Sequence, residues 1–214
     1  MTFNREKDLV SAGLHALGIA LSIVGTVALV RKGLSLSPWH VVSYAIFGAT
    51  MIGLYTASTV YHLFYVSERV HNILRRIDHI LIFLLIAGTY TPLCLLTLRG
   101  AWGWVLLGIV WGCALAGLFL KIFWMQAPRW LYTAFYIAMG WAALIALWPL
   151  TQRLSPAALC WLFGGGVVYT VGGVFYARRF PPIQSRYFGF HELFHVFILL
   201  GSICFFVLIY GFVV

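Results

Sequence analysis

Residues 189–213 read GFHELFHVFILLGSICFFVLIYGFV, a run of apolar residues with one acid, Glu192, and no lysine or arginine. About 20 consecutive apolar residues form a helix long enough to cross the ~30 Å hydrocarbon core of a bilayer. The run is therefore predicted to be a transmembrane helix. Two histidines, His191 and His195, lie in its first two turns.

Six further apolar runs of similar length precede it, separated by short polar breaks such as Ser37-Pro38 and Ser155-Pro156. Of the 214 residues, 63% are hydrophobic and 9% are charged, whereas soluble domains carry roughly 25% charged residues. A transmembrane β-barrel would show alternating segments of ~10 residues, and the sequence has none. The sequence predicts an all-α polytopic membrane protein with one seven-helix domain over residues 1–214. The predicted spans are 9–30, 39–64, 77–98, 102–123, 130–150, 157–177 and 189–213.

Lysine and arginine are distributed unequally between the two sides of the predicted bundle. Ten of the fourteen lie in the N-terminal tail and the even-numbered loops, with Lys121 and Arg129 counted in the fourth loop. Because positive residues are retained on the cytoplasmic side, we expect the N-terminus in the cytoplasm and the C-terminus outside. The net charge of +9 thus follows from topology, and no basic block indicates a nucleic-acid partner.

Ionisable side chains inside transmembrane spans are costly, so each is a candidate functional residue. The predicted topology places five polar residues in one layer beneath the cytoplasmic leaflet, because span two ends there and spans three and seven begin there. We expect Asp78 in the first turn of span three. The five residues are Ser58, His62, Asp78, His191 and His195.

The histidine spacing is typical of a metal site. His191 and His195 are four residues apart, so they share one helix face, and both imidazoles can reach one ion at about 2.0–2.1 Å. With His62 at the same depth, the set matches the three-histidine arrangement of catalytic zinc sites, which keep a fourth position open. The alternative is a polar packing seam in which the histidines bond to the backbone or to each other.

Two carboxylates lie near these histidines. Asp78 is a candidate general base, because a carboxylate in that layer could accept a proton from a metal-activated water; the alternative is an ion pair with Arg75 or Arg76. Residues 191–195 also read as HExxH, in which Glu192 would be the base of a zincin protease. The motif opens a transmembrane span here, so we expect Glu192 to anchor the cytoplasmic end of the helix instead.

Two other histidines lie inside predicted spans. His15 lies in the inner half of span one and could approach the same layer, or it could form a hydrogen bond between helices. His79 points about 100° away from Asp78 around the helix, which favours a supporting or packing role.

Three segments resemble a known family: Ser58-Thr-Val-Tyr-His62, then Arg76-Ile-Asp78-His79 leading to Ala87-Gly-Thr-Tyr-Thr-Pro92, then His191-Glu-Leu-Phe-His195. They resemble the hemolysin III family, the bacterial branch of the progestin and adipoQ receptors, within a wider group of membrane metal-dependent hydrolases that includes alkaline ceramidases. The resemblance implies that His62, His191 and His195 are zinc ligands, that Asp78 holds the zinc-bound water and that Ser58 supports the site. It also implies a multi-pass protein of the bacterial plasma membrane. The chain departs from the family in the first span, where Ser11 replaces the usual Asn four residues before His15.

Three functions are compatible with this resemblance. The first is a zinc-dependent hydrolase acting on a membrane lipid amide or ester, with a ceramide-like amide as the best substrate class. The expected partner is a membrane lipid, either ceramide-like or a fatty acid. The second is a non-catalytic regulator of membrane homeostasis in which zinc joins spans two, three and seven. The third is a pore-forming cytolysin, which the sequence disfavours because no amphipathic segment is available for insertion into a foreign membrane.

Overall fold

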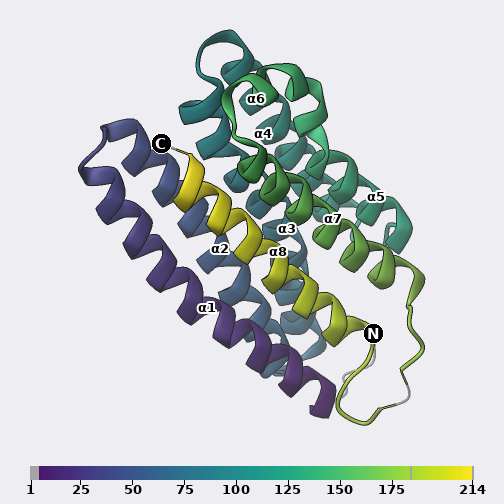
Figure 1. Cartoon of the computed structure of the whole chain (residues 1–214). Coiled ribbons are helices and arrows are strands. Elements are labelled where there is room, and N and C mark those ends of the chain that lie inside the picture. Colours follow the sequence, from purple (N-terminus) through teal and green to yellow (C-terminus); the bar gives the residue numbers. More distant parts are fainter. Residues whose placement is uncertain (1–4, 184, 214) are drawn as a thin grey trace.

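The computed structural model describes residues 5–183 and 185–213, which form helices joined by short connections (Figure 1). Seven helical segments are long and apolar enough to cross a membrane, and no strand occurs within these two ranges. The predicted all-α fold with seven spans is confirmed, and the chain is a multi-pass membrane protein. The α-helices are α1 (Arg5–Leu34), α2 (Pro38–Leu63), α3 (Glu68–Pro92), α4 (Gly100–Phe123), α5 (Arg129–Gly140), α6 (Leu147–Arg153), α7 (Pro156–Arg178) and α8 (Phe190–Phe212).

Serine and proline residues set the starts of three helices. Pro38 and Pro156 lie in the first turns of α2 and α7, where the missing N–H of proline leaves no helical bond unmade. The side chain of Ser155 accepts a hydrogen bond from the backbone N–H of Ala158, and Ser67 caps α3 in the same way. These short breaks are therefore sufficient to reverse the chain between spans.

Helix α3 begins at Glu68, nine residues before the predicted start of this span at residue 77. Residues 68–76 are too polar to belong to an apolar run, but the Ser67 cap starts them as part of the same helix. Asp78 consequently lies about 15 Å from the helix start, at 1.5 Å per residue. The expectation that Asp78 lies in the first turn is therefore wrong, and the residue is 7% exposed.

Pro92 ends α3, and the backbone continues as a π-helical segment over Leu93–Leu98. The hydroxyls of Thr89 and Thr91 donate to carbonyls one turn earlier, at 2.8 and 2.9 Å. These bonds satisfy the hydroxyls within the bilayer, where no water is available to do so. The carbonyls that accept them belong to Leu85 and Ala87, next to the Gly88 carbonyl that the missing N–H of Pro92 leaves without its helical donor.

Tyr90 ties α3 to an interruption in the fifth span. Helix α5 ends at Gly140, and a 3₁₀ turn over Ala142–Ala146 leads into α6. The Tyr90 hydroxyl donates to the carbonyl of Gly140 at 2.6 Å and accepts from the N–H of Ala143 at 2.8 Å. One side chain thereby satisfies backbone groups on both sides of the break and links α3 to α5.

A glycine on α1 allows three helices to meet near the functional residues. A Cβ atom at Gly18 would lie 2.7 Å from the Tyr55 ring on α2 and 3.0 Å from Leu199 on α8. Small residues of this kind let transmembrane helices approach closely. The first half of α1 therefore lies against both α2 and α8, as the purple, blue and yellow ribbons show (Figure 1).

Candidate metal centre

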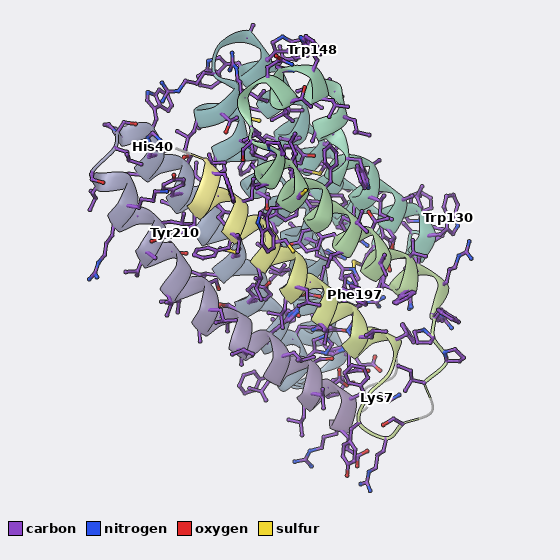
Figure 2. All side chains as sticks on the ribbon, viewed as in Figure 1. Lys7, His40, Trp130, Trp148, Phe197 and Tyr210 are labelled. Carbon is purple, nitrogen blue, oxygen red and sulfur yellow. The ribbon has the colours of Figure 1, made fainter. Side chains whose placement is uncertain are left out.

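Three histidines converge where the last turn of α2 meets the first two turns of α8. The Nε2 atom of His191 lies 3.2 Å from Nε2 of His62 and 3.1 Å from Nε2 of His195. One nitrogen from each ring lies within 4.8 Å of the other two, and His62 and His195 are only 3% and 2% exposed. The cluster lies at the end of the bundle marked by Lys7, opposite His40 (Figure 2). Packing thus brings the three predicted ligands together.

The possible proton positions on the three rings favour a metal site over a seam of hydrogen bonds between the histidines. Nδ1 of His62 lies 2.7 Å from Oδ1 of Asp8. A carboxylate only accepts, so this Nδ1 carries the proton and Nε2 of a neutral His62 is bare. Nε2 of His191 can donate to that bare nitrogen, but it cannot then accept from His195. Neutral rings satisfy only one of the two contacts, whereas a cation attracts all three nitrogens at once.

Protonating His62 would not resolve this conflict. Nε2 of His62 would then donate to the single lone pair on Nε2 of His191, and that lone pair could not also accept from His195. A positive charge on a buried ring would also be costly. The cluster therefore has the donor set of a site that could hold a metal ion.

Asp78 and Ser58 are buried in the same layer. The Asp78 carboxyl lies near Ser58 and within electrostatic range of His62, Arg75 and Lys121. Among the residues the structure describes, Asp78 has no ion pair within 4.0 Å, so the alternative of a direct pair with Arg75 does not form. Ser58 is 1% exposed, and its hydroxyl has no partner with hydrogen-bond geometry in the described residues.

The charge count placed Lys121 in the fourth loop, but in the structure it is a helix residue. It lies in the last turn of α4 and is fully buried. Its ammonium lies 3.3 Å from the centre of the Tyr132 ring, a cation–π contact that strengthens when the cation is desolvated. A buried cation therefore lies within electrostatic range of Asp78. The predicted span 102–123 contains residue 121, but hydropathy could not show that its side chain is buried against α5.

Glu192 is buried in the first turn of α8 and bonds to another helix. It is 3% exposed, and its Oε1 accepts a hydrogen bond from the Ser11 hydroxyl on α1 at 3.1 Å. The contact to α1 explains the burial: the first turn of α8 is covered by another helix rather than by water. Ser11, which departs from the family pattern, thus has a structural partner.

The first half of α1 contributes further to the centre. Asp8 bonds to His62, and the ring of His15 stacks on that of His195 with ring centres 3.9 Å apart. Both His15 nitrogens lack hydrogen-bond partners in the described chain, so the expected approach of His15 to this layer is observed without an interhelical hydrogen bond. Asp8 was missed because it precedes the first apolar run. Its spacing of seven residues from His15, which puts both on one helix face, could have indicated it.

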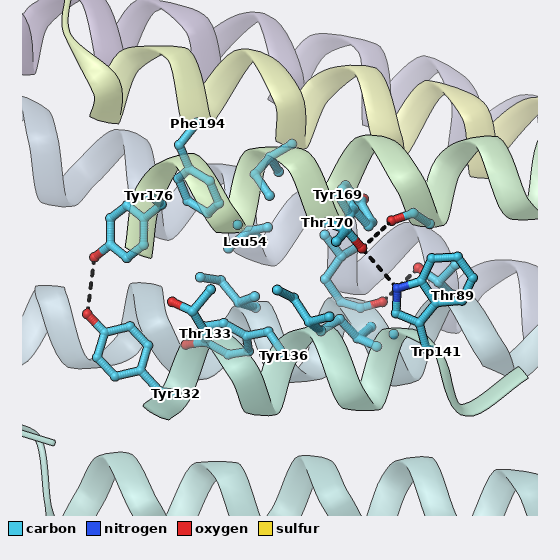
Figure 3. A pocket seen from close by; sticks show the side chains of 18 of the residues that line it. Leu54, Thr89, Tyr132, Thr133, Tyr136, Trp141, Tyr169, Thr170, Tyr176 and Phe194 are labelled. Atoms are coloured by element: carbon cyan, nitrogen blue, oxygen red, sulfur yellow. Dashed lines mark hydrogen bonds between the residues drawn. The ribbon is translucent and has the colours of Figure 1, made fainter. Parts of the chain in front are cut away.

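An apolar cavity begins at the histidine cluster and extends along the bundle between α3, α5, α7 and α8. His191 and His79 line one end, together with Tyr132 and Tyr176, whose hydroxyls lie 3.3 Å apart. Figure 3 shows this pair at one end of the cavity and Trp141 at the other. His191 therefore belongs both to the metal cluster and to the cavity wall.

Comparison with known proteins finds similar chains. A family model described as "Haemolysin-III related" matches residues 3–206. The chain is 40% identical to the hemolysin-3 homolog of Bacillus subtilis (strain 168) over 201 residues, which cover 94% of this chain and 91% of that protein. It is 35% identical to hemolysin-3 of Bacillus cereus over 206 residues, with coverages of 94% and 90%. The human monocyte to macrophage differentiation factor is 26% identical over 166 residues, with coverages of 76% and 68%.

Proposed function

The chain belongs to the haemolysin-III related family, and from the geometry of its buried cluster we propose that it is a zinc-dependent hydrolase of membrane lipids. The main support for the proposal is that the His191 ring belongs to the histidine cluster and also lines the apolar cavity. A lipid chain in this cavity would bring its polar end to the cluster. The substrate class we favour is a ceramide-like amide, with a fatty acid as product.

The spacing of the nitrogens supports zinc. Ligands at about 2.05 Å in tetrahedral directions are separated by about 3.3 Å. The two Nε2–Nε2 distances in the cluster are 3.2 and 3.1 Å. Little movement is therefore needed for His62, His191 and His195 to bind one zinc ion, and three protein ligands leave a fourth position for water or substrate.

The cavity lining supports an acyl-chain substrate. Its walls are mostly aliphatic and aromatic side chains, and most of the polar groups among them bond to backbone carbonyls or to each other, as Tyr136 does to the His79 carbonyl and Trp141 does to Thr170, both at 2.9 Å. Figure 3 shows these bonded groups between the helices. A wall with few unpaired polar groups is typical of sites that bind apolar ligands. We assign the cavity to the hydrocarbon chain and its His191 end to the scissile carbonyl.

The residues around the cluster have separate roles in this proposal. A bound zinc ion supplies a water of lowered pKa and polarises a carbonyl. Asp78 is the general base that accepts the proton from the attacking water and passes it to the leaving amine. Ser58 orients the Asp78 carboxyl, which it faces. Lys121 interacts electrostatically with the same carboxyl.

Wild-type protein and two variants, each prepared in the same detergent, test the proposal. Wild-type protein should contain about one zinc per chain and release fatty acid from a ceramide-like substrate. Asp78→Asn should retain zinc but lose about 10²–10⁴ of the hydrolysis rate, the usual contribution of a general base. His191→Ala should lose both. Wild-type protein with full zinc and no turnover on any lipid amide or ester would contradict the hydrolase.

One observation favours a non-catalytic alternative. The ligands come from α2 and α8, and these two helices pack mainly against other neighbours: α2 against α1 and α3, α8 against α7 and α1. A metal ion would thus reinforce a junction that has few other direct links, one of them the hydrogen bond from Tyr55 on α2 to Ser202 on α8 at 2.6 Å. In that case Asp78→Asn would lower stability and leave zinc content unchanged, and no lipid would be consumed.

A further inference from the structure

Helix α1 faces the candidate metal centre with three polar residues at helical spacing. Asp8, Ser11 and His15 lie three and four residues apart, so they form one stripe along the helix. Each contacts a different part of the centre: Asp8 bonds to His62, Ser11 bonds to Glu192, and His15 stacks on His195. Ser11 and His15 are buried, at 0% and 3% exposure. The stripe supplies no nitrogen to the three-histidine cluster, yet it covers one side of it.

The Asp8 contact has a chemical consequence that packing alone would not have. A carboxylate accepts hydrogen bonds and donates none. At 2.7 Å from Oδ1 of Asp8, Nδ1 of His62 must therefore carry a proton. This fixes the tautomer in which Nε2 is bare, and the bond also restricts rotation of the ring. Nε2 is the atom that faces His191 in the cluster.

Among the three histidines, only His62 bonds to a carboxylate. Nδ1 of His191 is buried without a hydrogen-bond partner in the described part of the chain, and His195 has only the backbone of Ser11 nearby. The two rings share one helix, so the backbone of α8 already sets their relative positions. His62 comes from another helix and has no such constraint. A ligand of this kind needs an outer partner to hold its orientation.

We propose that Asp8 is a positioning residue of the metal centre: by accepting the Nδ1 proton of His62, it directs Nε2 of that ring toward the metal. The inference rests on the proposed zinc site. It assigns to α1 a part in metal binding although α1 provides no ligand. Carboxylates that bond to the outer nitrogen of a metal-binding histidine orient the ring and raise its basicity, and their loss typically lowers metal affinity 10–100-fold.

Metal affinity of the full-length protein in detergent tests this role. Zn²⁺ and Co²⁺ dissociation constants are measured by chelator competition for wild type, Asp8→Ala, Asp8→Asn and Glu6→Gln. Asp8→Ala should bind both metals about 10–100-fold more weakly. Asp8→Asn should lose less, since an amide oxygen still accepts the Nδ1 proton although it lacks the charge. Glu6→Gln is the matched control, because Glu6 lies on the same helix end but bonds to exposed Arg186, and it should bind as wild type does.

Melting temperatures of the metal-free proteins separate positioning from folding. Asp8→Asn keeps the hydrogen bond, so in the presence of chelator it should have the same melting temperature as wild type. Its weaker metal binding then cannot be attributed to unfolding. Unchanged affinity in Asp8→Ala, within about threefold of a wild type that does bind metal, would overturn the role of Asp8 and leave the zinc site intact. An equal loss in Asp8→Asn and Asp8→Ala would overturn the tautomer argument. Wild type that binds neither ion would overturn the zinc site itself.

Discussion

Removing the metal from the histidine cluster should lower the melting temperature of the protein by about 5–11 °C. His62 and His191 are 129 residues apart in sequence, so the unfolded chain has no such site and the metal binds the folded state only. Free metal at 100 times its dissociation constant then stabilises folding by about 2.7 kcal/mol. For a chain of this length, each kcal/mol corresponds to roughly 2–4 °C.

The perturbation is made in two ways, by adding EDTA to wild type and by the substitution His191→Ala. His191 is chosen because its Nε2 contacts both other rings. Intrinsic fluorescence in detergent gives the melting temperature, and elemental analysis gives the zinc content. Wild type should respond to EDTA and the variant should not. Any remaining difference between the two in EDTA measures the lost packing of the His191 ring against Tyr176 and Phe194.

A control at the other end of the bundle makes the result interpretable. His40 is also buried, at 5% exposure, but its ring bonds to Ser37 and lies far from the cluster; Figure 2 shows it opposite Lys7. His40→Ala should retain zinc and the full EDTA response. The reasoning is refuted if wild type melts at the same temperature with and without EDTA, or if His191→Ala contains zinc in full.

Substitutions at three other positions probe the choice of general base, the cavity and the fold. Glu192→Gln should keep zinc and most hydrolysis, since an amide oxygen can still accept from Ser11; a loss as deep as that of a ligand variant would favour the zincin mechanism instead. A Cβ at Gly173 meets its nearest neighbours at ordinary contact distance, 3.4 Å and beyond, so Gly173→Ala should be active, whereas Gly173→Leu should fill the cavity and reduce lipid turnover roughly tenfold or more without zinc loss. Tyr90→Phe removes the partner of two backbone groups and should destabilise the protein by about 1–3 kcal/mol, seen as a lower melting temperature with zinc content unchanged.

Much of this protein follows from its sequence because a bilayer restricts what a helix can do. Each apolar run must cross the hydrocarbon core, so run length and the prolines at the breaks were enough to predict seven spans. The order of the spans then assigns a depth to every polar residue. His62 ends one span and His191 begins another, and from these positions alone the two were predicted to share a layer. The structure brings their Nε2 atoms to 3.2 Å.

The depth of a residue in the membrane is only part of its position. Its lateral position depends on how the helices pack. Hydropathy could not show that α1 packs against both α2 and α8, so it gave no reason to pair Asp8 with His62 or Ser11 with Glu192. The start of α3 was also misplaced, because a helix can continue past the membrane on hydrogen bonds that hydropathy does not register.

The cavity and the buried cation were likewise decided by tertiary structure. Lys121 looks like a loop residue until α4 and α5 bring it over the Tyr132 ring. The cavity is lined by Gly140, where α5 ends, and by Tyr90, which bonds to Gly140 from α3. Local sequence sets which residues lie at a given depth in the membrane. Lateral packing of helices distant in sequence decides which of them meet, because only packing fixes the rotation and the neighbours of each helix.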